Sequence, residues 1–182
     1  MGDTAVTEKK RQRLVAVCGV KNSGKTTLLS RLVGELSKEG MKVAVIKHDG
    51  HDFTCDACGT DSYRLKEAGA YGTAVFSDFR IFVHKTGFKE NEKDLIRMFP
   101  EADIIFIEGM KESSYPKIEV IREGISRAPV SNPMGRFLIV TDRDRTEYKE
   151  ETAGFEEIQR IIEKIRNRRY ETDEKREYDE RD

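Results

Sequence analysis

The chain has 182 residues, the length of one ordinary domain, and its 33 Lys and Arg residues nearly balance its 34 Asp and Glu residues. This balance excludes a strongly basic protein built to neutralise nucleic-acid phosphates. No segment approaches the roughly 20 apolar residues that a membrane span needs, and the polar N-terminus lacks the apolar segment of a secretory signal. Three cysteines are too few for a disulfide framework, so we expect a cytoplasmic protein with no nucleic-acid or membrane partner.

Much of the charge lies in the last 17 residues, 166–182, which include 6 basic and 7 acidic residues. Alternating charge without an apolar stripe cannot offset the entropy cost of folding, so we expect a disordered tail or a frayed helix end. A tail that binds a partner is the alternative. We expect the remaining residues, 1–165, to form one domain.

Strand and helix patterns alternate along the chain. Short apolar runs predict strands, which in chain order are residues 14–18, 42–47, 73–77, 80–84, 103–107, 118–121 and 137–140. Apolar residues at helical spacing predict helices over residues 25–38, 62–68, 92–99 and 156–165. Asp61 is the expected cap of the second helix, and a tight turn near Asp78 joins strands 73–77 and 80–84. The alternation predicts an α/β fold with a mainly parallel sheet, flanking helices and an added β-hairpin.

A phosphate-binding loop follows the first strand. Its sequence, GVKNSGKTT, matches G-x-x-x-x-G-K-[ST] and opens the first helix, as in P-loop NTPases. Glycines let the backbone curl so that N–H groups point at phosphate oxygens, and the helix adds the positive end of its dipole. Lys25 is expected to reach the β- and γ-phosphates, and the Thr26 hydroxyl to bind Mg²⁺. The predicted nucleotide contacts are Gly19, Lys21, Asn22, Ser23, Gly24, Lys25, Thr26 and Thr27.

An acidic residue is expected beside this loop, because ligands of open parallel sheets bind at the carboxyl ends of strands. The second strand ends at residues 47–49, and the apolar strand DIIFI ends at Glu108. We expect Glu108 to act on Mg²⁺ or on the attacking water, and a purely structural carboxylate is the alternative. Asp103 starts the same strand, and five residues at about 3.3 Å each place it at the opposite edge. Lys25 and Glu108 are therefore the candidate catalytic residues.

Two histidines and two cysteines lie close together in the segment HDGHDFTCDAC. His48, His51, Cys55 and Cys58 form H-x-x-H-x-x-x-C-x-x-C, in which the cysteine pair and the imidazoles would supply four ligands to Zn²⁺. A redox pair and thiols without a shared role are the alternatives. Cys18 lies within the first strand and is expected in the core.

The guanine-recognising sequence N/T-K-x-D is absent. Residues 141–144, Thr-Asp-Arg-Asp, follow a late strand, where a base-recognising loop often lies. Asp142 or Asp144 would accept hydrogen bonds from N1–H and the 2-amino group of guanine. A polar loop without a ligand is the alternative.

Four stretches carry a resemblance to a known family. They are GVKNSGKTTLLSRL, KHDGHDF, GTDSYRLKEAGA and DIIFIEGMKESSYPKIEVIR. The chain resembles the MobB family, P-loop GTP-binding adaptors of molybdopterin-guanine dinucleotide biosynthesis. The resemblance implies GTP binding with weak hydrolysis, a homodimer, and work beside molybdenum-cofactor enzymes. It also implies that Asp49 or Asp61 lies near Mg²⁺. Cys58-Gly59 stands where the family usually has Pro-Gly.

Two other functions would use the same phosphate loop. A small-molecule kinase would need an Arg-rich lid over the phosphates, and Arg122, Arg127 and Arg136 are scattered in the sequence. A metallochaperone GTPase would carry its metal on Cys55 and Cys58. Without an identifiable arginine finger, we expect slow hydrolysis.

Overall fold

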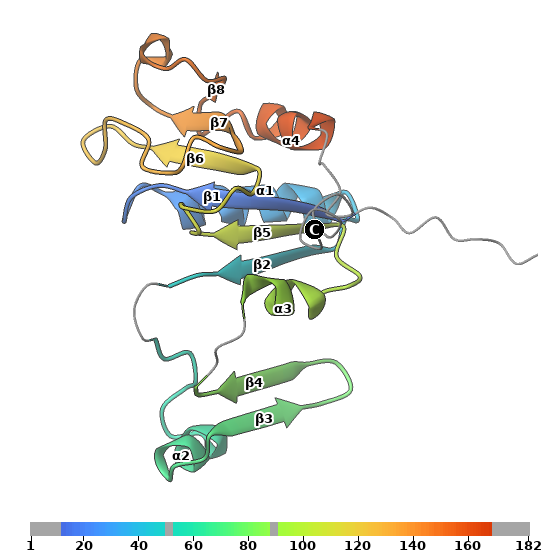
Figure 1. Cartoon of the computed structure of the whole chain (residues 1–182). Coiled ribbons are helices and arrows are strands. Elements are labelled where there is room, and N and C mark those ends of the chain that lie inside the picture. Colours follow the sequence, from blue (N-terminus) through green and yellow to red (C-terminus); the bar gives the residue numbers. More distant parts are fainter. Residues whose placement is uncertain (1–11, 50–52, 88–90, 169–182) are drawn as a thin grey trace, which may run out of the picture. The chain divides into compact units, whose positions relative to one another are not determined.

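Six parallel strands form the larger sheet of the computed structural model, in the order β2-β5-β1-β6-β7-β8 (Figure 1). The structure describes residues 12–49, 53–87 and 91–168. The strands are β1 (Arg13–Cys18), β2 (Val43–Lys47), β5 (Ile104–Glu108), β6 (Lys117–Ile121), β7 (Arg136–Thr141) and β8 (Thr152–Ala153). The helices of this part are α1 (Lys25–Lys38) and α4 (Ile158–Asn167), with a 3₁₀ turn, η1 (Arg145–Glu147).

Residues 49–98 form a second compact unit, and the first unit holds the described residues up to His48 and from Phe99 onward. The second unit contains α2 (Asp61–Glu67), the antiparallel strands β3 (Gly72–Phe76) and β4 (Ile81–Lys85), and α3 (Glu92–Arg97). It supplies the hairpin that the sequence predicts.

The predicted α/β fold, with its mainly parallel sheet and added hairpin, is confirmed. The expected cap of α2 is wrong by one residue. Thr60, with φ −72° and ψ 161°, is the cap, and its side chain accepts a hydrogen bond from the Tyr63 N–H. Strand β8 and turn η1 were not predicted, and residues 169–182 of the expected tail lie outside the described residues. Whether residues 1–165 behave as one domain stays a prediction.

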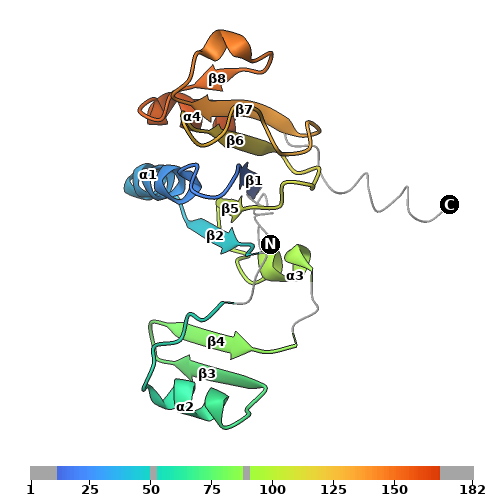
Figure 2. The same ribbon diagram turned by 90° about the vertical axis from the view of Figure 1, so that its left-hand side faces the viewer.

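One face of the larger sheet packs against α1 and α4 (Figure 2). Side chains alternate between the two faces of a strand, so every second residue of the central strands points to these helices. Val15, Val17, Phe106 and Val120 are fully buried there, together with the Leu28 to Leu36 stripe of α1. The apolar spacing that predicts α1 is therefore the spacing that covers the sheet. Among the described residues, no helix has the length and apolar character that crossing a membrane requires.

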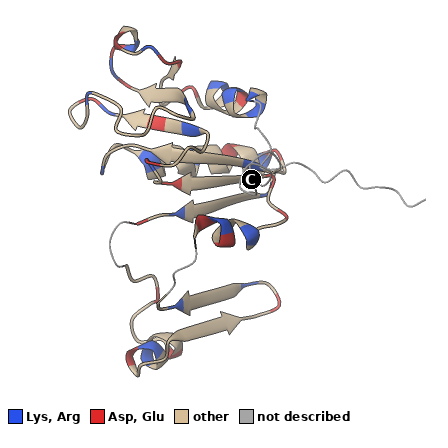
Figure 3. Ribbon diagram, viewed as in Figure 1, with Lys and Arg blue, Asp and Glu red and all other residues tan. Residues whose placement is uncertain are grey.

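Strand β6 carries two buried charges whose side chains point to the other face of the sheet, and Figure 3 shows both signs of charge on this strand. The Lys117 ammonium donates to the carbonyl oxygens of Ser113 and Asn132, and Glu119 accepts a hydrogen bond of 2.9 Å from the Val130 N–H. Burial lowers the pKa of Lys117. These contacts tie the loops before and after β6 to the sheet.

We predict that Lys117→Met lowers the free energy of unfolding by about 2 kcal/mol, because two carbonyl groups lose their donor. Lys111→Met, in the loop before β6, removes a largely exposed ammonium and should have almost no effect. Chemical denaturation of both variants measures the difference. Equal stability of the two variants would show that Lys117 does not hold the loops.

Candidate functional site

The loop between β1 and α1 has a backbone that only glycine accommodates at two positions. Gly19 and Gly24 have φ values of +140° and +97°. A Cβ atom on Gly19 would lie 2.5 Å from the Val120 carbonyl oxygen. Gly24 is also the N-cap of α1, and because it has no side chain, the first N–H groups of the helix remain available to an anion. The start of α1, with no side-chain cap, therefore lies at the carboxyl edge of the sheet.

The side chain of Lys25 folds back onto the backbone of the phosphate loop. The Lys25 ammonium donates to the carbonyl oxygens of Gly19 at 3.1 Å and Val20 at 2.7 Å. Ser23 is fully buried beneath the loop, whereas Lys21 and Asn22 are exposed. Of the predicted phosphate contacts, Ser23 is therefore buried, whereas Lys21 and Asn22 face solvent.

A nearly buried carboxylate, that of Glu108, lies beside the start of α1. The Thr26 hydroxyl donates to its two oxygens at 3.1 and 3.0 Å, and the Lys47 ammonium lies 3.1 Å from Oε1. Strand register causes this convergence, because Glu108 is paired with Val17 of β1 on one side and with Lys47 of β2 on the other. A hydroxyl and a carboxylate are hard oxygen donors of the kind that Mg²⁺ prefers, so the pair fits this ion.

Asp103 lies at the opposite end of β5, as the sequence predicts. Its carboxylate accepts a hydrogen bond of 2.8 Å from the Lys42 N–H, at the start of β2. Lys47 contacts the Glu108 carboxylate as well, a role that the sequence does not predict. Its position at a strand end was visible in the sequence, but its contact with Glu108 depends on the order of strands, which residue spacing does not give.

The remaining predicted metal ligands are divided between the two units. Asp49, Asp61, Cys55 and Cys58 belong to the second unit, where both thiols and the Asp61 side chain are exposed. His48 belongs to the first unit, where its N–H donates to the Glu108 carbonyl oxygen at 2.9 Å.

His51 lies outside the described residues, and the residues that are described contain no group of three or more His, Cys, Asp or Glu able to hold a metal ion. The roles of these six residues as Mg²⁺ or Zn²⁺ ligands stay predictions. Cys18 is buried in β1, as expected. Its thiol donates to the Gly109 carbonyl oxygen at 3.0 Å, and burial raises its pKa to about 12.

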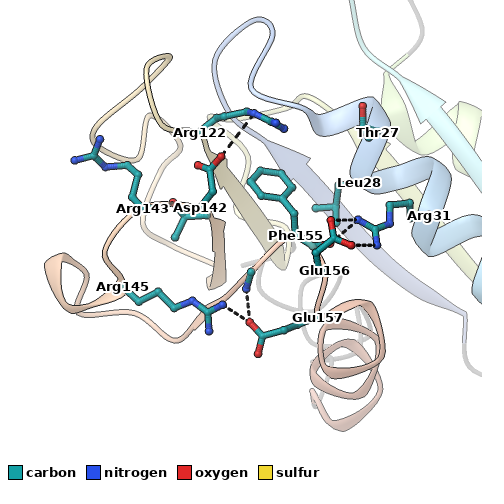
Figure 4. A pocket seen from close by; sticks show the side chains of 12 residues that line it. Thr27, Leu28, Arg31, Arg122, Asp142, Arg143, Arg145, Phe155, Glu156 and Glu157 are labelled. Atoms are coloured by element: carbon teal, nitrogen blue, oxygen red, sulfur yellow. Dashed lines mark hydrogen bonds and ion pairs between the residues drawn. The ribbon is translucent and has the colours of Figure 1, made fainter.

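A cavity of about 650 Å³ adjoins the phosphate loop (Figure 4). The first turns of α1 form one wall, and the segments that follow β6, β7 and β8 form the other. Its lining residues are Thr27, Leu28, Arg31, Arg122, Thr141, Asp142, Arg143, Arg145, Gly154, Phe155, Glu156 and Glu157.

Arg122 connects this cavity to the phosphate loop. Its guanidinium lies 5.0 Å from the centre of the Phe155 ring, and its Nε is 3.8 Å from Oδ2 of Asp142. Its Nη1 would lie 3.2 Å from a Cβ atom on Gly24. Figure 4 shows these side chains converging on one side of the cavity. Residue spacing does not predict this role, because Arg122 comes close to Gly24 only when β6 lies beside β1.

The two candidate base-recognising carboxylates have different surroundings. Asp142 lines the cavity and accepts a hydrogen bond of 2.7 Å from the Glu123 N–H. Asp144 caps η1 by accepting from the N–H and hydroxyl of Thr146 at 3.0 and 2.8 Å, and these bonds lower its pKa. Asp142 is therefore the carboxylate that faces a space for a ligand.

Ion pairs hold the outer wall of the cavity. Arg31 pairs with Glu156 at 2.7 Å, and Arg145 pairs with Glu157. The Gly154 N–H also donates to Glu157, and this bond and the nearby Arg160 lower the pKa of Glu157 to about 2. At neutral pH this wall therefore carries a carboxylate beside each of these arginines.

Comparison with known proteins identifies relatives of this chain. A family model described as "MobB: Molybdopterin guanine dinucleotide synthesis protein B" matches residues 14–142. The molybdopterin-guanine dinucleotide biosynthesis adapter protein of Escherichia coli strain K12 is 35% identical over 136 residues, which are 72% of this chain and 78% of that protein. The protein of the same name from Haemophilus influenzae is 35% identical over 117 residues, 63% of this chain and 66% of that protein.

Solved structures show the same fold. Bacillus subtilis MobB has a TM-score of 0.66 at 21% identity, over 86% of this chain and 99% of that one. A MobB homolog from Bacillus stearothermophilus has a TM-score of 0.62 at 20% identity, over 85% and 99% of the two chains. The family model covers well over half of the sequence, including the phosphate loop and the strand that carries Glu108. The chain therefore belongs to the MobB family.

Proposed function

We propose that this protein is a GTP-binding adapter in molybdopterin-guanine dinucleotide biosynthesis that works in the cytoplasm beside the enzymes of that pathway. Its relatives are named as adapters of this process. Nucleotide binding is supported by one observation above all. The loop before α1 has a backbone that requires glycine at Gly19 and Gly24, and the Thr26 hydroxyl that follows it donates to the buried Glu108 carboxylate. The three cysteines are free thiols, as is usual in cytosolic proteins.

Each residue of the loop has a distinct task in the proposed binding. The N–H groups at the start of α1 and the Lys25 ammonium would bind the β- and γ-phosphates. Thr26 and Glu108 would hold Mg²⁺, which neutralises phosphate charge. Because the Thr26 hydroxyl and the Lys47 ammonium already contact the Glu108 carboxylate, we propose that this carboxylate holds the metal ion and does not activate the attacking water. Because no residue is then assigned to activate the attacking water, we expect weak hydrolysis of GTP.

Lys25→Ala should weaken GTP binding by about 10- to 100-fold, since a hydrogen bond to a charged group contributes about 1.5–3 kcal/mol. Titration of a fluorescent GTP analogue in the presence of Mg²⁺ measures the loss. Lys38→Ala, at the far end of α1, is the matched control and should bind like the wild type. Equal affinities for Lys25→Ala and wild type would disprove the phosphate-loop assignment.

We propose that the cavity beside α1 receives the guanine base. The Phe155 ring and the Arg122 guanidinium offer flat surfaces, and Asp142 offers a carboxylate to the N1–H and 2-amino groups. Adenine has no N1–H or 2-amino group to donate. Asp142 would therefore favour GTP over ATP.

Asp142→Asn should reduce the preference for GTP over ATP by about tenfold or more, because the amide is a weaker acceptor than the carboxylate. Competition of GTP and ATP against the fluorescent analogue measures this ratio. Asp144→Asn is the comparison, since asparagine keeps the cap of η1. A loss of preference in Asp144→Asn alone would move guanine recognition to that residue.

We propose that the second unit forms the homodimer contact. Its hairpin exposes large apolar side chains, with Phe76, Phe79 and Ile81 being 81%, 92% and 74% exposed. Such a cluster of exposed apolar side chains usually marks an interface.

The double substitution Phe79→Ser and Ile81→Ser should convert the dimer to a monomer, because it removes apolar area from the proposed contact. Light scattering during size-exclusion chromatography measures the mass of each species. Met134→Ser, a 65% exposed methionine of the first unit, is the control and should remain dimeric. A dimeric double variant would place the contact elsewhere, and a monomeric wild type would refute the dimer.

A further inference from the structure

Lys47, the last residue of β2, shares the Glu108 carboxylate with the threonine of the phosphate loop. Its Nζ lies 3.1 Å from Oε1 of Glu108, and the Thr26 hydroxyl lies 3.0 Å from Oε2. Lys47 and Glu108 are paired in the sheet register, so their side chains leave the same face. In Figure 3, the end of β2 is coloured as basic and the end of the neighbouring β5 as acidic.

The two members of this ion pair differ in their freedom to move. Glu108 is 6% exposed and is held by Thr26, and its backbone carbonyl accepts a hydrogen bond from the His48 N–H. The Lys47 side chain is 57% exposed. The carboxylate is therefore fixed, while the ammonium can exchange one anion for another at little cost in packing.

We propose that Lys47 is a second phosphate-binding lysine that recognises the terminal phosphate of the nucleotide. The inference deepens the proposed function and rests on it. In P-loop proteins, the metal held by the loop threonine and the strand-end carboxylate contacts both β- and γ-phosphate oxygens. A cation in contact with Glu108 thus lies at the terminal-phosphate end of the loop. The cavity that contains Asp142 lies at the other end, beyond β1 in the strand order.

Electrostatics favours transfer of the ammonium from Glu108 to the phosphate. With its charge offset by Mg²⁺, Glu108 would hold Lys47 less strongly. The terminal phosphate carries more negative charge than one carboxylate and accepts charge-assisted hydrogen bonds. Lys25, which lies over the loop at Gly19 and Val20, would contact β- and γ-phosphates alike and so favours di- and triphosphates together. Lys47 would contact the γ-phosphate, which a nucleoside diphosphate does not have.

Lys47→Met tests the proposal, because it keeps the side-chain length and removes the charge. Affinities for fluorescent GTP and GDP analogues are measured in the presence of Mg²⁺. We expect GTP binding to weaken by about 10- to 100-fold and GDP binding to change less than about twofold. Lys42→Met, just before the other end of β2, is the control and should leave both affinities unchanged. Lys47→Arg keeps the charge and should retain the preference for GTP.

Retained GDP binding in Lys47→Met also shows that the variant is folded. Equal loss of both nucleotides, or no loss of GTP, would overturn the proposal, because Lys47 would then only support Glu108 or have no part in binding. Failure of the proposed function looks different. In that case the wild type binds neither nucleotide, or Lys25→Ala binds both as the wild type does, and the inference fails with it.

Discussion

The nearly buried carboxylate of Glu108 is the constraint on which the carboxyl edge of the sheet depends. A charge with so little access to water is costly unless hydrogen bonds and an opposite charge compensate it. Here the compensation comes from two directions, the Thr26 hydroxyl of α1 and the Lys47 ammonium of β2. The need to satisfy one side chain therefore links the ends of three neighbouring strands to the phosphate loop. The same oxygens are of the hard kind that Mg²⁺ prefers.

Sequence patterns predicted the parts of the site that are local in the chain. The loop from Gly19 to Thr27 depends on residues within nine positions, and the strand before Glu108 is a continuous apolar run that is visible in the sequence. Lys47 and Arg122 could not be assigned in this way. Their contacts with Glu108 and with the loop near Gly24 depend on which strands are neighbours, and residue spacing does not give the order β2-β5-β1-β6.

The errors in the fold have similarly local causes. Strand β8 has two residues, too few for any alternation to appear in the sequence. Thr60 and Asp61 are both good capping residues, and only the backbone angles show that Thr60 precedes the first helical residue. In β6, Lys117 and Glu119 interrupt the apolar pattern, because on this face they bind the backbone of loops instead of packing against a helix.

Residues 49–98 also form the connection between two neighbouring strands of the larger sheet, β2 and β5. Strands β2 and β5 are parallel neighbours, and parallel neighbours need a crossover connection, which in most α/β proteins is a single helix. Here an entire unit with its own hairpin occupies that connection. Its chain leaves the sheet directly after Lys47 and His48, at the carboxyl edge, and returns before Asp103, at the opposite edge. The crossover that carries the unit proposed to meet a second protomer therefore begins next to Lys47, the residue proposed to contact the terminal phosphate.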